Sequence, residues 1–92
     1  MSIVAVKTYV SGRVQAVGFR FHTMEKAGQL NVCGFAQNLP DGRVYVYAEG
    51  HKNQLQNLVD WLEEGPETSE ISSLSVEWLA APEGQYQDFQ IR

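Results

Sequence analysis

The chain has 92 residues, with seven basic against eleven acidic side chains, and its formal net charge at pH 7 is −4. This length fits a single domain, residues 1–92, with one modest hydrophobic core. The negative charge does not steer the whole molecule toward a polyanion. We therefore expect no nucleic-acid partner, and any anion site must be local.

The one cysteine, Cys33, cannot form an internal disulfide, which is typical of a cytoplasmic protein. The apolar run at residues 3–6 is interrupted by Lys7 and is too short for a signal peptide or a membrane span. We expect a cytoplasmic protein with no membrane partner. Because no apolar stripe leaves a large face unused, we also expect a monomer.

The first half of the chain predicts a strand and then a helix. A half-buried strand is predicted over residues 3–11, because its valines share one parity. These valines are Val4, Val6 and Val10. An amphipathic helix is predicted from residue 19 to 30, ending near Gly28 or Asn31, because apolar residues recur every three positions. They are Phe21, Met24, Ala27 and Leu30.

The remainder predicts a hairpin, a second helix and two more strands. Runs at residues 32–37 and 43–49 flank a turn at residues 39–42 and predict the hairpin. The helix that follows carries apolar side chains at i, i+3, i+4 and i+7 and is closed by Gly65-Pro66. These side chains are Leu55, Leu58, Val59 and Leu62. Alternation over residues 72–79 and in the tail, residues 86–92, predicts the last two strands.

This order of elements matches the ferredoxin-like βαββαβ arrangement of α+β proteins, with one strand added at the C-terminal side. In that arrangement both helices lie on one face of an antiparallel-type sheet. The core is therefore expected between the second helix and the valines of the sheet. The predicted core residues are Leu55, Leu58, Val59, Leu62, Val44, Val46 and the valines of the first strand.

The segment from Gly12 to Arg20 joins the first strand to the first helix and is a candidate anion site. Amide N–H groups at a helix start lack intrahelical partners, and the helix dipole favours negative charge there. Arg20 lies where a cation opposes that dipole, which suggests that an anion binds nearby. The alternative is a structural turn, in which Gly12 and Gly18 serve only the backbone. The segment lacks the patterns of triphosphate and dinucleotide loops.

Asn38 stands at the end of a predicted strand, beside the turn at residues 39–42. The simpler interpretation is an Asx-type turn contact, which we favour from the residues alone. The alternative is that its carboxamide, which both donates and accepts hydrogen bonds, holds a water molecule in line with a bound phosphoryl group.

Other candidate residues indicate no second chemistry. His22 and His51 have no partners at metal-ligand spacing, so we expect no metal site. Cys33 is interpreted as a small core residue. An RNA-binding domain of similar topology would use Tyr45 and Tyr47 as stacking platforms, but the negative charge argues against it.

Two motifs in this order resemble the acylphosphatase family, a group of small ferredoxin-like enzymes. Residues 12–20 reproduce that family's Gly-x-Val-Gln-Gly-Val-x-Phe-Arg loop, except that Ala16 replaces the usual central glycine. The second motif runs from Gly34 through Asn38 to Asp41-Gly42. The tail at residues 89–92 is also similar, so the resemblance extends over nearly the whole chain.

The resemblance implies hydrolysis of acyl phosphates, which are carboxyl-phosphate mixed anhydrides, to a carboxylate and inorganic phosphate (EC 3.6.1.7). It implies Arg20 and Asn38 as catalytic residues, with Arg20 binding phosphate and Asn38 orienting water, and it implies no metal or other cofactor. Phosphate or sulfate would bind as product-like ligands. The implied phosphate-binding residues are Gln15, Ala16, Val17, Gly18, Phe19 and Arg20.

Ala16 leaves a second function open. If the loop holds this residue at positive φ, its Cβ costs about 1 to 2 kcal/mol, and phosphate binding is expected to be weaker than with glycine. The alternative function is a non-catalytic phosphate-binding or regulatory module of the same fold. The acyl end of the substrate has no recognisable signature in the sequence.

Overall fold

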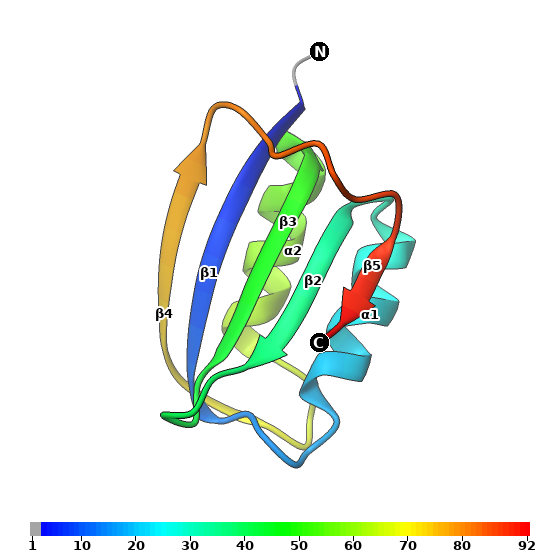
Figure 1. The fold of residues 1–92 in the computed structure, drawn as a ribbon. Coiled ribbons are helices and arrows are strands. Elements are labelled where there is room, and N and C mark those ends of the chain that lie inside the picture. The colour runs from blue at the N-terminus through cyan, green and yellow to red at the C-terminus, as the bar shows by residue number, and fades with distance from the viewer. Residues whose placement is uncertain (1–2) are drawn as a thin grey trace.

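A mixed β-sheet forms one layer of the molecule, and two helices cover one of its faces (Figure 1). The computed structural model describes residues 3–92. The elements are β1 (Ile3–Arg13), α1 (Phe19–Gln29), β2 (Cys33–Asn38), β3 (Val44–His51), α2 (Lys52–Glu64), β4 (Glu70–Leu79) and β5 (Phe89–Ile91).

The strand order is β4-β1-β3-β2-β5, which confirms the predicted ferredoxin-like topology. The pairs β1–β3, β1–β4 and β2–β3 are antiparallel, whereas the added strand β5 runs parallel to β2. The extra strand is also shorter than predicted, because the residues before it cross the end of the sheet instead of pairing (Figure 1).

The core lies between the sheet and the helices, as predicted. Alternation along β1 and β3 turns one set of side chains toward the helices, and the apolar stripe of α2 packs on them. All of the predicted residues of β3 and α2 are buried there: Val44, Val46, Leu55, Leu58, Val59 and Leu62. No helix within residues 3–92 is long and apolar enough to cross a membrane.

Helix α1 buries a stripe that shares only Ala27 with the predicted one. Phe19, Thr23 and Ala27, spaced four residues apart, are buried, and the Thr23 hydroxyl donates to the Phe19 carbonyl oxygen at 2.8 Å. Met24 and Leu30 pack at the border of the core. The prediction was wrong for Phe21, whose side chain is 50% exposed.

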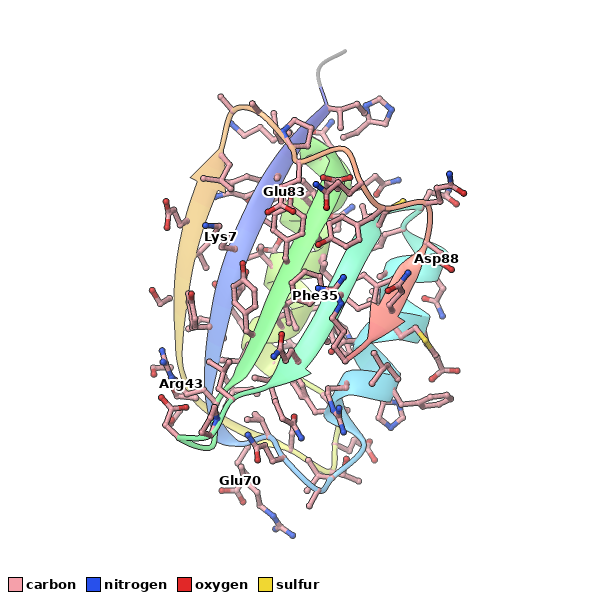
Figure 2. All side chains as sticks on the ribbon, in the orientation of Figure 1. Lys7, Phe35, Arg43, Glu70, Glu83 and Asp88 are labelled. Carbon is pink, nitrogen blue, oxygen red and sulfur yellow. The ribbon has the colours of Figure 1, made fainter. Side chains whose placement is uncertain are left out.

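The other face of the sheet carries a group of aromatic side chains (Figure 2). Phe35 contacts the rings of Tyr45, Tyr47 and Tyr86 at centroid distances between 5.6 and 5.9 Å. The Tyr47 hydroxyl donates to the Glu49 carboxylate at 2.8 Å and accepts from the Glu83 backbone N–H at 2.9 Å. These contacts fasten the segment between β4 and β5 to the sheet.

Candidate active site

The segment between β1 and α1 starts with an irregularity in the sheet. The β1–β4 pairing shifts register between Ser11 and Gly12, and Gly12 has φ +128°. A Cβ on Gly12 would lie 2.1 Å from the Glu70 carbonyl oxygen. Gly12 is therefore required for close approach to β4, and its role in this fold is structural.

The loop that follows has the backbone of an anion site. Ala16 has φ +62°, and Gly18 has φ +75° as the residue that caps α1. Within residues 3–92, no amide from Gln15 to Arg20 donates a backbone hydrogen bond. Left-handed residues in such a loop turn successive N–H groups toward one concave side, where the positive end of the α1 dipole adds to their field.

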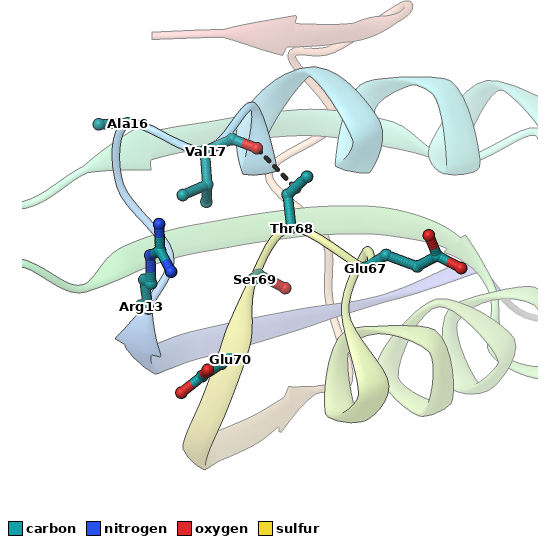
Figure 3. Close-up of a pocket in the computed structure, with 7 residues that line it drawn as sticks. All are labelled: Arg13, Ala16, Val17, Glu67, Thr68, Ser69 and Glu70. Atoms are coloured by element: carbon teal, nitrogen blue, oxygen red, sulfur yellow. Dashed lines mark hydrogen bonds between the residues drawn. The ribbon is translucent and has the colours of Figure 1, made fainter.

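Two side-chain contacts hold this loop in shape. The Gln15 side-chain amide donates to the carbonyl oxygens of Leu39 and Arg43, at 2.8 and 3.0 Å, and so joins the loop to the β2–β3 turn. The Thr68 hydroxyl donates to the Val17 carbonyl oxygen at 2.8 Å (Figure 3). No pattern in the sequence predicts this role of Thr68, because its partner lies 51 residues away and is a backbone atom.

Arg20 and Asn38 meet at a hollow of about 150 Å³ beside this loop. They come from different elements, the first turn of α1 and the last residue of β2, which the topology brings to the same end of the molecule (Figure 1). Of the predicted phosphate-binding residues, Gln15 and Val17 do not line the hollow. Its lining residues are Val14, Ala16, Gly18, Phe19, Arg20, Phe21, Asn38 and Ile91.

The Arg20 guanidinium is fixed by the C-terminal end of the sheet. Its Nη1 donates to the main-chain oxygen of Arg92 at 2.6 Å. Two contacts fix the position of Arg92. Its backbone N–H donates to the Ala36 carbonyl oxygen at 2.8 Å, and its guanidinium lies 3.9 Å from the centre of the Phe35 ring. Among the described residues no Asp or Glu side chain pairs with Arg20, so most of its five N–H donors remain for a ligand.

The Asn38 side chain does not make the turn contact that we favoured from the sequence. In this turn the Asp41 carboxylate takes that role, accepting from the Arg43 backbone N–H at 3.1 Å. The Asn38 Oδ1 is buried and has no hydrogen-bond partner within the described part of the chain. A half-turn of the amide exchanges its oxygen and its NH₂ group, so either can face the hollow.

A larger hollow of about 390 Å³ lies on the other side of the loop (Figure 3). It shares Ala16 with the first hollow, but its one arginine, Arg13, is accompanied by the carboxylates of Glu67 and Glu70. Two acidic side chains against one basic side chain disfavour an anion. The smaller hollow is therefore the candidate phosphate site.

The remaining candidates carry no reactive group. Burial raises the pKa of the Cys33 thiol, and the nearby carboxylates of Glu49 and Asp88 raise it further, so the thiol stays protonated. His22 lies 3.5 Å from Glu25 on the surface of α1. Residues 3–92 contain no group of three or more His, Cys, Asp or Glu side chains arranged to hold a metal ion.

The open face of the sheet, which is the face away from the helices, does not expose the tyrosine rings that an RNA-binding sheet would need. Tyr47 is only 1% exposed, and the ring of Tyr86 covers it at a centroid distance of 5.5 Å. Tyr45 is partly buried between Tyr9 and Phe35. Base stacking requires an accessible ring face, so this geometry argues against that alternative.

The fold and this hollow together define a ferredoxin-like α+β domain with a candidate anion-binding loop at one end of its sheet. The sequence matches the acylphosphatase family over residues 6–91. It is 39% identical over 90 residues to an acylphosphatase from Acaryochloris marina, covering 98% of this chain and 95% of that one. It is 42% identical over 91 residues to one from Vibrio vulnificus, covering 99% of both.

A solved structure agrees with these relatives. The crystal structure of acylphosphatase from Bacillus subtilis matches with a TM-score of 0.92 and 35% identity, covering 97% of this chain and 98% of that one. The chain therefore belongs to the acylphosphatase family. It is an enzyme of that class, EC 3.6.1.7, and its reaction is the hydrolysis of acyl phosphates.

Proposed function

We propose that Arg20 and Asn38 are the catalytic residues of this acylphosphatase and that the loop backbone from Gln15 to Phe19 binds the phosphoryl group. One observation carries the proposal: within the described residues, a single hollow unites a guanidinium that pairs with no Asp or Glu side chain, an amide oxygen without a partner and a helix start with free N–H groups. Each of these groups matches one need of phosphoryl transfer.

In the proposed reaction, these residues act on the phosphoryl group and on the attacking water. The loop N–H groups and Arg20 hold the phosphoryl oxygens, and the Asn38 amide orients a water molecule behind phosphorus. The water oxygen bonds to phosphorus as the bond from phosphorus to the acyl oxygen breaks, so the carboxylate leaves with the electron pair. The water protons remain on phosphate or pass to solvent.

No strong base is needed in this scheme, because a carboxylate is a good leaving group and the transition state is loose. Charge on the equatorial oxygens is met by preorganised donors, and we propose that no metal ion takes part. If Arg20 behaves like an oxyanion-hole donor, its loss costs on the order of 3 kcal/mol in transition-state stabilisation, which is roughly a hundredfold in rate.

The test compares hydrolysis of acetyl phosphate by the parent, Arg20→Ala and Asn38→Ala, all with a chelator present. We expect both variants to lose about a hundredfold or more in kcat/KM. The matched controls are Arg13→Ala, in the larger hollow, and Asn57→Ala, exposed on α2, and both should retain activity. Retained activity in Arg20→Ala and Asn38→Ala, or its loss on chelation, would contradict the proposal.

We also propose that residues 1–92 act as one domain and as a cytoplasmic monomer. The family match over residues 6–91 supports the first point, and the unpaired, protonated thiol of Cys33 supports a reducing compartment. Light scattering on the purified chain tests the monomer directly, since a dimer would double the molar mass.

A further inference from the structure

We propose that Phe21 and Ile91 form an acyl-binding wall beside the phosphate hollow, which makes the enzyme select acyl phosphates with apolar, uncharged acyl groups. This inference rests on the proposed function, because it takes Arg20 and the loop as the site of the phosphoryl group. It adds the chemistry of the other half of the substrate.

The first evidence is that two large apolar side chains are left exposed at one place. Phe21 is 50% exposed and Ile91 is 40% exposed. Single exposed apolar residues are normal on a protein surface. These two, however, come from α1 and β5, which are distant in sequence, and both line the hollow that contains Arg20 and Asn38.

The wall is preformed, because the contacts that fix Arg20 also fix its neighbours. Phe21 follows Arg20 in the first turn of α1, and Ile91 precedes Arg92, whose main-chain oxygen accepts from Arg20 at 2.6 Å. Ile91 is also paired in register with Ala36 of β2. A phosphoryl group held at Arg20 would therefore place its acyl substituent near both apolar side chains.

Charge around the hollow defines which acyl groups fit. Arg20 is the only charged side chain that lines it within the described residues. Arg92 does not supply a second cation there, because its guanidinium stacks on Phe35 on the open face of the sheet. A second anionic group on the acyl chain would thus meet apolar surface and no counter-charge, which is unfavourable.

The first experiment measures kcat/KM for benzoyl phosphate and for acetyl phosphate and takes their ratio. Phe21→Ser should lower this ratio about tenfold, because the benzoyl ring loses an apolar contact that the acetyl group barely makes. Phe21→Leu should restore most of it. The matched control is Trp78→Ser, which removes another exposed aromatic ring, on β4 at the opposite edge of the sheet, and should leave the ratio within about twofold.

The second experiment adds the missing charge. Butanoyl phosphate and succinyl phosphate both have four carbons in the acyl chain, but succinyl phosphate carries a free carboxylate at the far end of that chain. The parent should prefer the butanoyl compound, and Ile91→Lys should shift this preference toward succinyl phosphate by about tenfold. The control Val76→Lys changes the net charge equally at a distant exposed residue of β4 and should produce no shift.

The outcomes separate this inference from the proposed function. If the parent hydrolyses all four compounds but neither Phe21→Ser nor Ile91→Lys changes its preference, the acyl wall is refuted and the phosphate site stands. If the parent hydrolyses none of them, both proposals fail. Circular dichroism of each variant ensures that a lost preference is compared only among folded proteins.

Discussion

Buried polar groups differ between two regions: the loop end of the sheet, which holds residues 15–20 and Asn38, and the open face, which is the face of the sheet away from the helices. At the loop end, the Asn38 Oδ1 is buried without a partner, and Ala16 adopts a left-handed conformation. On the open face, the Tyr47 hydroxyl makes two hydrogen bonds, and the Glu49 carboxylate accepts from Tyr47 and from the Gly84 N–H at 3.1 Å. Both regions contain buried polar groups, but only on the open face do the groups named here have hydrogen-bond partners within the protein.

This difference distinguishes the candidate site at the loop end from a structural network on the other face of the sheet. An unsatisfied polar group or a strained residue costs free energy and persists where a ligand or a reaction makes use of it. A satisfied network instead stabilises the segment that it joins to the sheet. Variants at the loop end should therefore change catalysis with little effect on stability, and variants on the open face should do the reverse.

After the alanine variants of Arg20 and Asn38, the largest expected effect is that of Arg20→Lys at the loop end. Lysine keeps the charge but lacks the planar fork that can bind the main-chain oxygen of Arg92 and a phosphoryl oxygen together. We expect kcat/KM for an acyl phosphate to fall by about thirtyfold, with a change of less than about 0.5 kcal/mol in the free energy of unfolding. Steady-state kinetics measures kcat/KM, and urea unfolding measures the free energy of unfolding. Full activity in the variant would show that the fork is not needed.

The opposite result is expected for Tyr47→Phe on the open face. Removal of the hydroxyl leaves both the Glu49 carboxylate and the Glu83 N–H short of a partner, which costs about 1 to 3 kcal/mol. Urea unfolding measures this loss, and kcat/KM should remain unchanged. Tyr9→Phe is the matched control, since the Tyr9 hydroxyl forms no hydrogen bond to another part of the described chain. An equal loss in both variants would refute the role of the network.

The tyrosines of the open face should make the free energy of unfolding fall at alkaline pH. Burial raises the pKa of Tyr47 from 10.0 to about 12, and it raises the pKa of Tyr45 to about 12 as well. The unfolded chain therefore releases these protons at lower pH than the folded chain, so the stabilisation is complete below pH 10 and is lost as the pH rises toward 12. The loss for Tyr47 is at most about 1.4 kcal/mol per pH unit.

Urea unfolding between pH 9.5 and 11.5 measures this slope. Tyr47→Phe should reduce this slope to the contribution of Tyr45, and Tyr45→Phe should reduce it to the contribution of Tyr47. An identical slope in the parent and in Tyr47→Phe would contradict the assignment.

The sequence predicted the fold well because periodicity reports burial directly. The stripe of α2 and the alternation of β1 and β3 each have one dominant apolar face, and their residues are buried as expected, except that Val4 is only partly buried. Helix α1 carries apolar residues at two spacings, three and four, and only the tertiary structure decides that Phe19 is buried and Phe21 is exposed. The direction of β5 is likewise set by the path of the segment before it.

From the residues alone, without the family resemblance, the candidate site was predictable only where one residue has a local reason to be unusual. Arg20 stood out as a cation at a helix start, but the choice between the two interpretations of Asn38 depended on Asp41, which accepts the turn hydrogen bond in its place. The Gln15 side chain and Thr68 act through backbone carbonyls that are 24 to 51 residues away. Spacing in the sequence carries no information on such contacts.

The smallest expected effect is that of Ala16→Gly, which tests whether the strained backbone at residue 16 weakens binding by the loop. The Ala16 Cβ lines the hollow, and φ +62° is a conformation that costs a residue with a Cβ about 1 to 2 kcal/mol. If the loop binds phosphate as we propose, this cost lowers the population of the loop conformation that is ready to bind and reduces the apparent affinity for phosphate by the same fraction.

Glycine removes the strain, although it also makes the unfolded chain more flexible, so the free energy of unfolding should change by less than about 1 kcal/mol. We expect KM for an acyl phosphate to fall by up to about fivefold, and the inhibition constant of inorganic phosphate should fall in parallel with kcat little changed. Measuring both constants separates binding from chemistry. Unchanged values in Ala16→Gly would mean that the loop holds its binding conformation in spite of the strain, because Gln15 and Thr68 fix it from either side.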